Sequence, residues 1–271
     1  MILTAPAYVS ALVPMAGGEG EGYQTPTPEI FWQPLFEVGG LTVTNSMAWA
    51  AIITAVLSFV MIALSKKAAV VPGKGQWLFE NFYNLPRNTV ARDMIGTRDF
   101  MRFVPLIVTL FTMVLFYNLA GSFFGSMMPV NSKIGFPIAL TLVVYVVYHW
   151  IGVKKHGLAG YFKHMVPGGL PKAVVPVIFP LELITYFITR PLTLALRLFG
   201  NMFAGHMLIV LFVMGGVFLL TQGPLMALAG AGSLVMGALM FVFKMLIMTV
   251  QAYVFTLLTA SYIGDAVAEA H

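Results

Sequence analysis

Five long apolar stretches, separated by more polar segments, dominate the pattern of hydrophobic and polar positions along the chain. They occupy residues 46–64, 103–124, 134–153, 173–221 and 224–263. The first contains 19 residues without a charge, enough for an α-helix to cross a hydrocarbon core roughly 30 Å thick. The pattern therefore predicts an all-α integral membrane protein with about five membrane-spanning helices.

The last two stretches are longer than one membrane crossing requires. Forty helical residues extend about 60 Å, twice the hydrocarbon thickness. Each stretch is therefore either one strongly tilted helix or two spans joined by a tight turn near Pro191, Gly215-Gly216 or Gly230–Gly232. Polar turn residues are missing at those points, whereas Gln222-Gly223-Pro224 reads as a clear turn. The pattern favours two long, strongly tilted helices that form a hairpin.

Residues 46–264 are expected to form a single membrane domain with polar segments before, within and after it. Residues 1–45 are rich in Gly, Pro and Glu and contain no basic residue, which suggests a polar, partly irregular N-terminal arm. Between the first two spans, in residues 65–102, apolar residues such as Trp77 and Leu78 recur at helical spacing among charged ones. This pattern is typical of an amphipathic helix in the membrane interface, with an ordinary cytoplasmic loop as the alternative. Residues 265–271 would form a C-terminal tail.

The composition supports a membrane protein. Of 271 residues, 59% are hydrophobic and 9% are charged, and the mean hydropathy is +0.89. Soluble domains contain about 25% charged residues. Soluble enzymes and nucleic-acid-binding proteins are therefore disfavoured, despite a net charge of +5, and the absence of cysteine disfavours a disulfide scaffold.

The basic residues indicate how the chain crosses the membrane. Eleven of the 15 Lys and Arg residues lie in residues 65–102 and 154–172, whereas residues 125–133 contain only Lys133. Because basic loops stay on the cytoplasmic side, we expect the N-terminal arm outside and the C-terminal tail in the cytoplasm.

Among the polar residues within the last two apolar stretches, Arg197 is the hardest to account for inside its own chain. An arginine side chain stays protonated, and an ionised group in a membrane needs a partner or an aqueous path. The nearest acidic residue is Glu182, fifteen positions earlier. We therefore expect a carboxylate from another chain to face Arg197, with packing against Glu182 or backbone carbonyls as the alternative.

Arg197 lies within a series of polar and small residues at i+4 intervals, a pattern typical of close helix packing in lipid. The series consists of Thr185, Thr189, Thr193, Arg197, Asn201 and Gly205. His206 lies nine residues after Arg197 and so faces the opposite side of the helix, where its imidazole is suited to carrying protons. Arg190 is expected to extend to a membrane interface, and Lys244 either does the same or lies buried.

Three segments resemble sequence motifs of the subunit a family of bacterial-type rotary F-type ATP synthases. The stretch TRPLTLALRLFGNMFAGH, from Thr189 to His206, resembles the Arg-centred signature of that family. The stretch QAYVFTLLT, from Gln251 to Thr259, resembles its last-helix motif, and Asn118-Leu-Ala-Gly121 resembles its Asn-Leu-x-Gly element. The Arg-centred signature is highly specific, and the other two segments support it.

This resemblance implies a mechanism. Two oblique helices would lie against a rotating ring of c subunits, and Arg197 would attract ionised ring carboxylates and separate two aqueous half-channels. Asn201 and Gln251 match polar positions near the Arg, His206 matches a channel-lining site, and Glu182 resembles an acidic residue on the outlet side. Lys244 departs from the pattern, because many members carry an acid or His there, and we expect it to alter proton affinity in the inlet path.

The resemblance also implies an assembly. The chain would be a stator subunit in the bacterial plasma membrane, associated with peripheral-stalk b-type subunits and the rest of the F1Fo complex. No catalytic residue, cofactor, metal or nucleic acid is expected, and ATP chemistry would belong to other subunits because the chain lacks a Walker-type loop. Either H⁺ or Na⁺ is compatible with this assignment. A secondary transporter that binds an anionic substrate at Arg197 is the alternative, although no internal repeat is evident.

Overall fold

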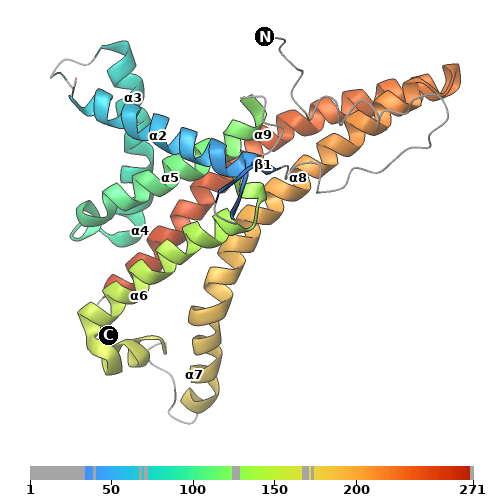
Figure 1. Ribbon diagram of the computed structural model, residues 1–271. Helices are drawn as coiled ribbons and strands as arrows, with labels where there is room; N and C mark the ends of the chain where they lie inside the picture. Colours follow the sequence, from blue (N-terminus) through green and yellow to red (C-terminus); the bar gives the residue numbers. More distant parts are fainter. Residues whose placement is uncertain are drawn as a thin grey trace. The chain divides into compact units, whose positions relative to one another are not determined.

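The computed structural model describes residues 34–38, 41–66, 69, 73–123, 129–166, 171 and 174–268 (Figure 1). Most of these residues are helical, which confirms the predicted all-α membrane fold. The one departure is a hairpin in which β1 (Pro34–Val38) pairs antiparallel with β2 (Leu41–Thr44), so the last part of the predicted arm is a strand pair that leads into the first span. The rest of that arm, residues 1–33, and residues 269–271 of the predicted tail lie outside the described residues.

Five of the described helices are long and apolar enough to cross a membrane. The first three are α2 (Asn45–Lys66), α5 (Phe100–Phe123) and α6 (Gly135–His164), with a 3₁₀ turn, η4 (Val130–Ser132), before α6. The fourth runs over Val175–Leu220 and comprises α7 (Val175–Ile184), the π-helical turn η5 (Thr185–Thr189) and α8 (Arg190–Leu220), and the fifth is α9 (Pro224–Val267).

Neither long stretch is divided into two spans by a turn in these described ranges. Pro191 and Gly215-Gly216 lie within α8, and Gly230–Gly232 lie within α9. The only turn between the two helices falls at Gln222-Gly223, where Gly223 has a φ of 114° that other residues rarely adopt. Of the two arrangements compatible with the sequence, the structure therefore contains one long helix for each stretch.

The segment between the first two spans is helical and not an irregular loop. It contains α3 (Lys74–Asn84), the π-helical η3 (Leu85–Arg92) and the short α4 (Asp93–Ile95). Trp77 and Leu78 are 59% and 65% exposed on α3, as expected for a helix that inserts apolar side chains into an interface.

The third span ends later than its apolar pattern predicts. Helix α6 continues past residue 153 to His164, with a kink at Gly157, where φ is 70°. The loop predicted over residues 154–172 is therefore helical in its first part, because basic residues at a membrane surface are compatible with helical structure. Within this part, Lys155 donates a hydrogen bond to the carbonyl of Val267 at the end of α9.

As far as it is described, the chain forms two compact units that each take parts of the long helices. One contains Met1–Ile53, Tyr117–Ser132 and Gly200–Thr249, and the other contains Thr54–Phe116, Lys133–Phe199 and Val250–His271. In the first unit the last part of α8 runs antiparallel beside the first part of α9 (Figure 1). Ser233 Oγ donates to the carbonyl of Phe212 at 2.7 Å, and Gly230 lies directly against Gly216. Small residues thus let the two backbones approach closely.

Burial differs strongly between the five spans. Two thirds (67%) of the apolar window of α5 is buried, against 11–33% for the other four. Large side chains such as Phe59 and Leu225 are 74% and 79% exposed. Exposed apolar side chains such as these suit contact with lipid or with other membrane subunits.

Candidate functional site

Arg197 lies on the outward face of α8. Its helical neighbours Leu194 and Leu198 are 1% and 0% exposed, whereas Arg197 itself is exposed. Among the described residues no carboxylate forms an ion pair with its guanidinium. Since the side chain cannot lose its charge, Arg197 is a permanent cation at the surface of a membrane helix without an anionic partner in this part of its chain.

The polar series around Arg197 is exposed along most of its length but is not a regular α-helical ridge. Thr189, Thr193, Arg197 and Asn201 are exposed, and Thr185 and Gly205 are half-buried. The first interval, from Thr185 to Thr189, is π-helical, so the predicted strict i+4 register begins only after η5. Thr185 and Thr193 donate to carbonyls of the preceding turn, Leu181 and Thr189 respectively, which satisfies their hydroxyls within the helix itself.

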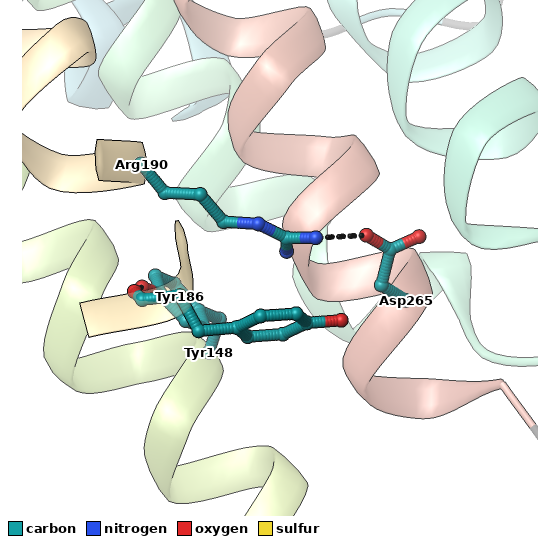
Figure 2. A network of polar contacts seen from close by, with 4 residues as sticks. All are labelled: Tyr148, Tyr186, Arg190 and Asp265. Atoms are coloured by element: carbon teal, nitrogen blue, oxygen red, sulfur yellow. Dashed lines mark hydrogen bonds and ion pairs between the residues drawn. The ribbon is translucent and has the colours of Figure 1, made fainter. Parts of the chain in front are cut away.

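Arg190, two turns before Arg197, has an ion pair and two aromatic partners within its own unit. Its Nη2 lies 3.2 Å from Oδ2 of Asp265, and its guanidinium lies 3.7 Å from the ring centroid of Tyr186 and 4.8 Å from that of Tyr262. Figure 2 shows the guanidinium extending toward Asp265 with the tyrosines Tyr148 and Tyr186 below it. The sequence predicted only that Arg190 extends to a membrane interface, and the structure adds an ion pair with Asp265, which lies in α9 and not in a separate tail.

A hydrogen bond from the third span supports the turn that carries Arg190. Tyr148 Oη, on α6, donates to the carbonyl of Tyr186 at 2.8 Å. That carbonyl lies inside the π-helical turn, where backbone bonding departs from the α-helical pattern. Three helical segments, α6, η5–α8 and α9, thus meet around Arg190.

The contrast between the two arginines defines the candidate site. Arg190 is 17% exposed and has a carboxylate and two aromatic faces as partners, whereas Arg197 is exposed and lacks an ion pair with any described residue. Helix α8 therefore presents one uncompensated positive charge to whatever covers this face.

His206 and Lys244 meet in the other unit. His206 is 7% exposed on α8 and Lys244 is 4% exposed on α9, and Lys244 Nζ lies 2.8 Å from His206 Nδ1. Of the two placements considered for Lys244, the buried one is therefore found. The antiparallel packing of the helices brings the two residues together, and the stem of the lysine lies beside Gly205. The pair places an imidazole and an amine side by side in a buried helix contact.

The remaining candidate residues differ in exposure. Glu182 is half-buried on α7, Asn201 is exposed on α8, and Gln251 is 4% exposed on α9. Glu182, Arg197 and Gln251 belong to one unit, and Asn201, His206 and Lys244 belong to the other. Of the six, the contact that the structure displays directly is the one between His206 and Lys244.

Asn118, from the Asn-Leu-x-Gly element, connects three parts of its unit. It is fully buried, accepts a hydrogen bond from Nδ2 of Asn131 at 2.7 Å, and donates to the carbonyl of Met248 on α9 at 3.4 Å. A buried amide satisfied by its neighbours fixes their relative positions. Asn118 therefore anchors α9 four residues after Lys244.

The sequence did not reveal the Arg190–Asp265 pair. The two residues are 75 positions apart, and Asp265 lies just beyond the predicted end of the last span. The only available signal is charge matching: both residues lie near the same predicted membrane surface, at the start of one hairpin helix and the end of the other.

Known proteins resemble this chain over most of its length. A family model of the ATP synthase A chain matches residues 46–264. ATP synthase subunit a of a Nocardioides species is 40% identical over 269 residues, which cover 93% of this chain and 96% of that relative. The same-named subunit of Paenarthrobacter aurescens is 41% identical over 210 residues (76% and 79% of the two chains), and that of Frankia alni is 35% identical over 255 residues (92% and 87%). The chain therefore belongs to the ATP synthase subunit a family.

Proposed function

We propose that this chain is the stator subunit at which proton flow drives rotation of a c-subunit ring, with Arg197 facing the ring carboxylates between two aqueous half-channels. As a subunit a, the chain is a multi-pass ion-transporting component of the membrane sector in the bacterial plasma membrane and is not catalytic on its own. The proposal concerns how its residues perform that transport.

The exposure of Arg197 without an ion pair to any described residue is the observation that carries the proposal. A permanent charge on a lipid-facing helix surface is costly unless an anionic group covers it. A ring whose subunits each bring one carboxylate past α8 would supply that group repeatedly. The guanidinium would hold each passing carboxylate in its ionised form, so that protons are released on one side of Arg197 and taken up on the other.

Burial of the other polar residues supports two separate proton paths. We assign His206 and Lys244, which form a buried pair, to the inlet half-channel, and half-buried Glu182 to the outlet side. Asn201 and Gln251 would line the region near the Arg as uncharged hydrogen-bonding groups. In this scheme Lys244 tunes proton uptake by His206, because its ammonium lies within hydrogen-bond distance of the imidazole.

The same proposal fixes partners and orientation. The exposed face of α8 would contact the c-subunit ring, and peripheral-stalk b-type subunits would hold this chain against rotation within the F1Fo complex. The exposed apolar side chains of the other spans would contact lipid and these subunits. The N-terminal arm would lie outside the cell and the C-terminus in the cytoplasm, as the distribution of basic residues indicates.

Replacing Arg197 tests the proposal. Arg197→Ala removes the charge, and Arg197→Lys keeps a charge but loses the fork of donors and can give up its proton to a carboxylate. We expect proton-driven ATP synthesis to fall about 100-fold or more in both variants, since removing one member of a desolvated charge pair costs about 3–5 kcal/mol. The assay is ATP synthesis by the reconstituted complex in vesicles under an imposed proton gradient.

Thr193→Ala is the matched control, because Thr193 lies one turn before Arg197 on the same exposed face and satisfies its hydroxyl within α8. We expect this variant to synthesise ATP at the wild-type rate. Coupled synthesis at a normal rate in either Arg197 variant would refute the role assigned to this residue.

A further inference from the structure

A cavity of about 590 Å³ lies where the first span meets the interfacial segment, and its lining includes none of the residues assigned to proton transport. Its walls come from the last turns of α2, from α3 and from the first turn of η3. Met61, Leu64 and Phe79 line one part of the cavity with apolar surface. Gln76, Glu80 and Arg87 contribute polar groups to the other part. A cavity of this size is within the range of about 300–1,000 Å³ that small-molecule sites occupy.

Arg87 is the charged group in this wall that has no carboxylate partner among the described residues. Among the described residues it forms no ion pair, its Nε is buried without a hydrogen bond, and its one polar contact is Nη2 at 3.9 Å from the sulfur of Met101. By contrast Glu80 accepts a hydrogen bond from Gln76 Nε2 at 2.7 Å, and Gln76 also exchanges two hydrogen bonds with the backbone of Ala69. The guanidinium therefore has donors available, in a planar arrangement that fits a phosphate group.

The surroundings of the cavity favour an anionic lipid. Exposed Lys66 at the end of α2 and exposed Lys74 at the start of α3 lie within two residues of Ser65 and Gln76, which line the cavity. Exposed Trp77 on α3 and Phe59 on α2 present apolar surface beside the polar wall, which suits acyl chains next to a head group. Basic pockets at the cytoplasmic end of membrane helices bind anionic phospholipid head groups by this combination.

We propose that this cavity binds the head group of an anionic glycerophospholipid, with Arg87 on the phosphate and the acyl chains along the exposed apolar face of α2. The lipid would join the first span to the amphipathic helix by occupying the space between them. This assignment is independent of the role proposed for Arg197, because the two sites share no residue.

Photolabelling of the intact ATP synthase complex tests the proposal. The complex is reconstituted in phosphatidylcholine nanodiscs with a trace of photoactivatable phosphatidylglycerol, and labelled peptides of this chain are identified by mass spectrometry. We expect labels on residues 61–65 and 76–87, and a loss of about tenfold or more in the Arg87→Gln variant, since a hydrogen bond to a charged group is removed. Unlabelled phosphatidylglycerol should compete for the site, whereas added phosphatidylcholine should not.

Arg92→Gln is the control, because it makes the same charge change on an exposed residue of η3 that does not line the cavity. Labelling should be unchanged in this variant. Equal labelling of wild type and Arg87→Gln, equal competition by the two lipids, or no labelling because a partner subunit fills the cavity would each overturn the proposal. If Arg87→Gln fails to assemble, competition on the wild-type complex decides the question on its own.

Discussion

At the scale of single residues, the two arginines of α8 differ in whether a described carboxylate compensates their charge. Arg190 and Arg197 are both arginines, seven residues apart on α8. Among the described residues Arg190 forms an ion pair, with Asp265, and Arg197 forms none. The pair with Asp265 removes Arg190 as a competitor for a passing anion. Arg197 is then the one described cation of α8 that remains available to a partner subunit.

The buried pair of His206 and Lys244 leads to a prediction about pH dependence. Two unit charges about 4 Å apart interact by about 4 kcal/mol at an effective dielectric constant of about 20, so the ammonium opposes proton uptake by the imidazole. Lys244→Gln removes this repulsion. We therefore expect the pH profile of ATP-driven proton pumping to move to higher pH by about one unit or more. Pumping is followed with a fluorescent pH indicator in inverted vesicles.

Ser233→Ala provides the comparison for that measurement, because Ser233 lies on the same helix and its hydroxyl donates to the Phe212 carbonyl across the hairpin, away from the imidazole. Its profile should coincide with that of the wild type. A Lys244→Gln profile that also coincides with the wild type would exclude Lys244 from the inlet path.

At the scale of elements, the hairpin of α8 and α9 brings together residues whose contacts could not be predicted from the sequence. Periodicity predicted the two helices and the turn at Gln222-Gly223, and the scarcity of nearby acidic residues made Arg197 a candidate site residue. They could not identify which residues face each other, because the contact between His206 and Lys244 depends on the antiparallel register of two long, uniformly apolar helices. The π-helical turn at Thr185–Thr189 was also missed, since no composition rule marks such a turn.

Close backbone contact at Gly230 gives a prediction about the hairpin. A Cβ at this position would lie 2.7 Å from the carbonyl oxygen of Gly216 and 2.9 Å from the backbone nitrogen of Leu220, so neither neighbour can move aside as a flexible side chain would. We expect Gly230→Ala to destabilise the hairpin by about 1–3 kcal/mol, as overpacking does. The measurement is the apparent melting temperature of the purified complex, followed by release of this subunit.

Gly232→Ala is the matched substitution two residues away. Nothing lies within 4 Å of a Cβ at position 232, and alanine is favoured over glycine within a helix by roughly 0.5–1 kcal/mol. This variant should be as stable as the wild type or slightly more so. Similar losses in both variants would show that the close approach of α8 and α9 at Gly230 is not what holds the hairpin together.

At the scale of the whole molecule, the distribution of charge predicts an orientation. The apolar stretches alone predicted the number of spans and the fold class, because a helix that crosses a membrane needs a minimum number of apolar residues. The sequence did not predict the β-hairpin before the first span, because its few strand residues form no long apolar pattern. Orientation rests on the basic residues, which gather in residues 65–102 and 154–172.

Cysteine labelling checks this orientation, and the chain is suited to it because it contains no cysteine. Asn88→Cys and Gln222→Cys place single thiols at exposed positions, on η3 and in the turn between α8 and α9. A membrane-impermeant maleimide should label position 222 but not position 88 in intact cells, and position 88 but not position 222 in inverted vesicles. The opposite pattern would place the N-terminal arm in the cytoplasm and reverse the assignment of the inlet and outlet paths.

The account as a whole requires that the partner carboxylate of Arg197 belongs to another subunit, and zero-length cross-linking tests this requirement most directly. In the Arg197→Lys complex a hydrophobic carbodiimide activates nearby carboxylates, and the amine at position 197 captures a carboxylate in contact with it as an amide. Leu192→Lys places the same amine on α8 at an exposed position about 140° around the helix. We predict an amide between residue 197 and a c-subunit carboxylate in the Arg197→Lys complex, and none in the wild-type or Leu192→Lys complexes. An adduct of residue 197 with Glu182 or Asp265 of its own chain, or equal adducts from both lysine variants, would contradict the account.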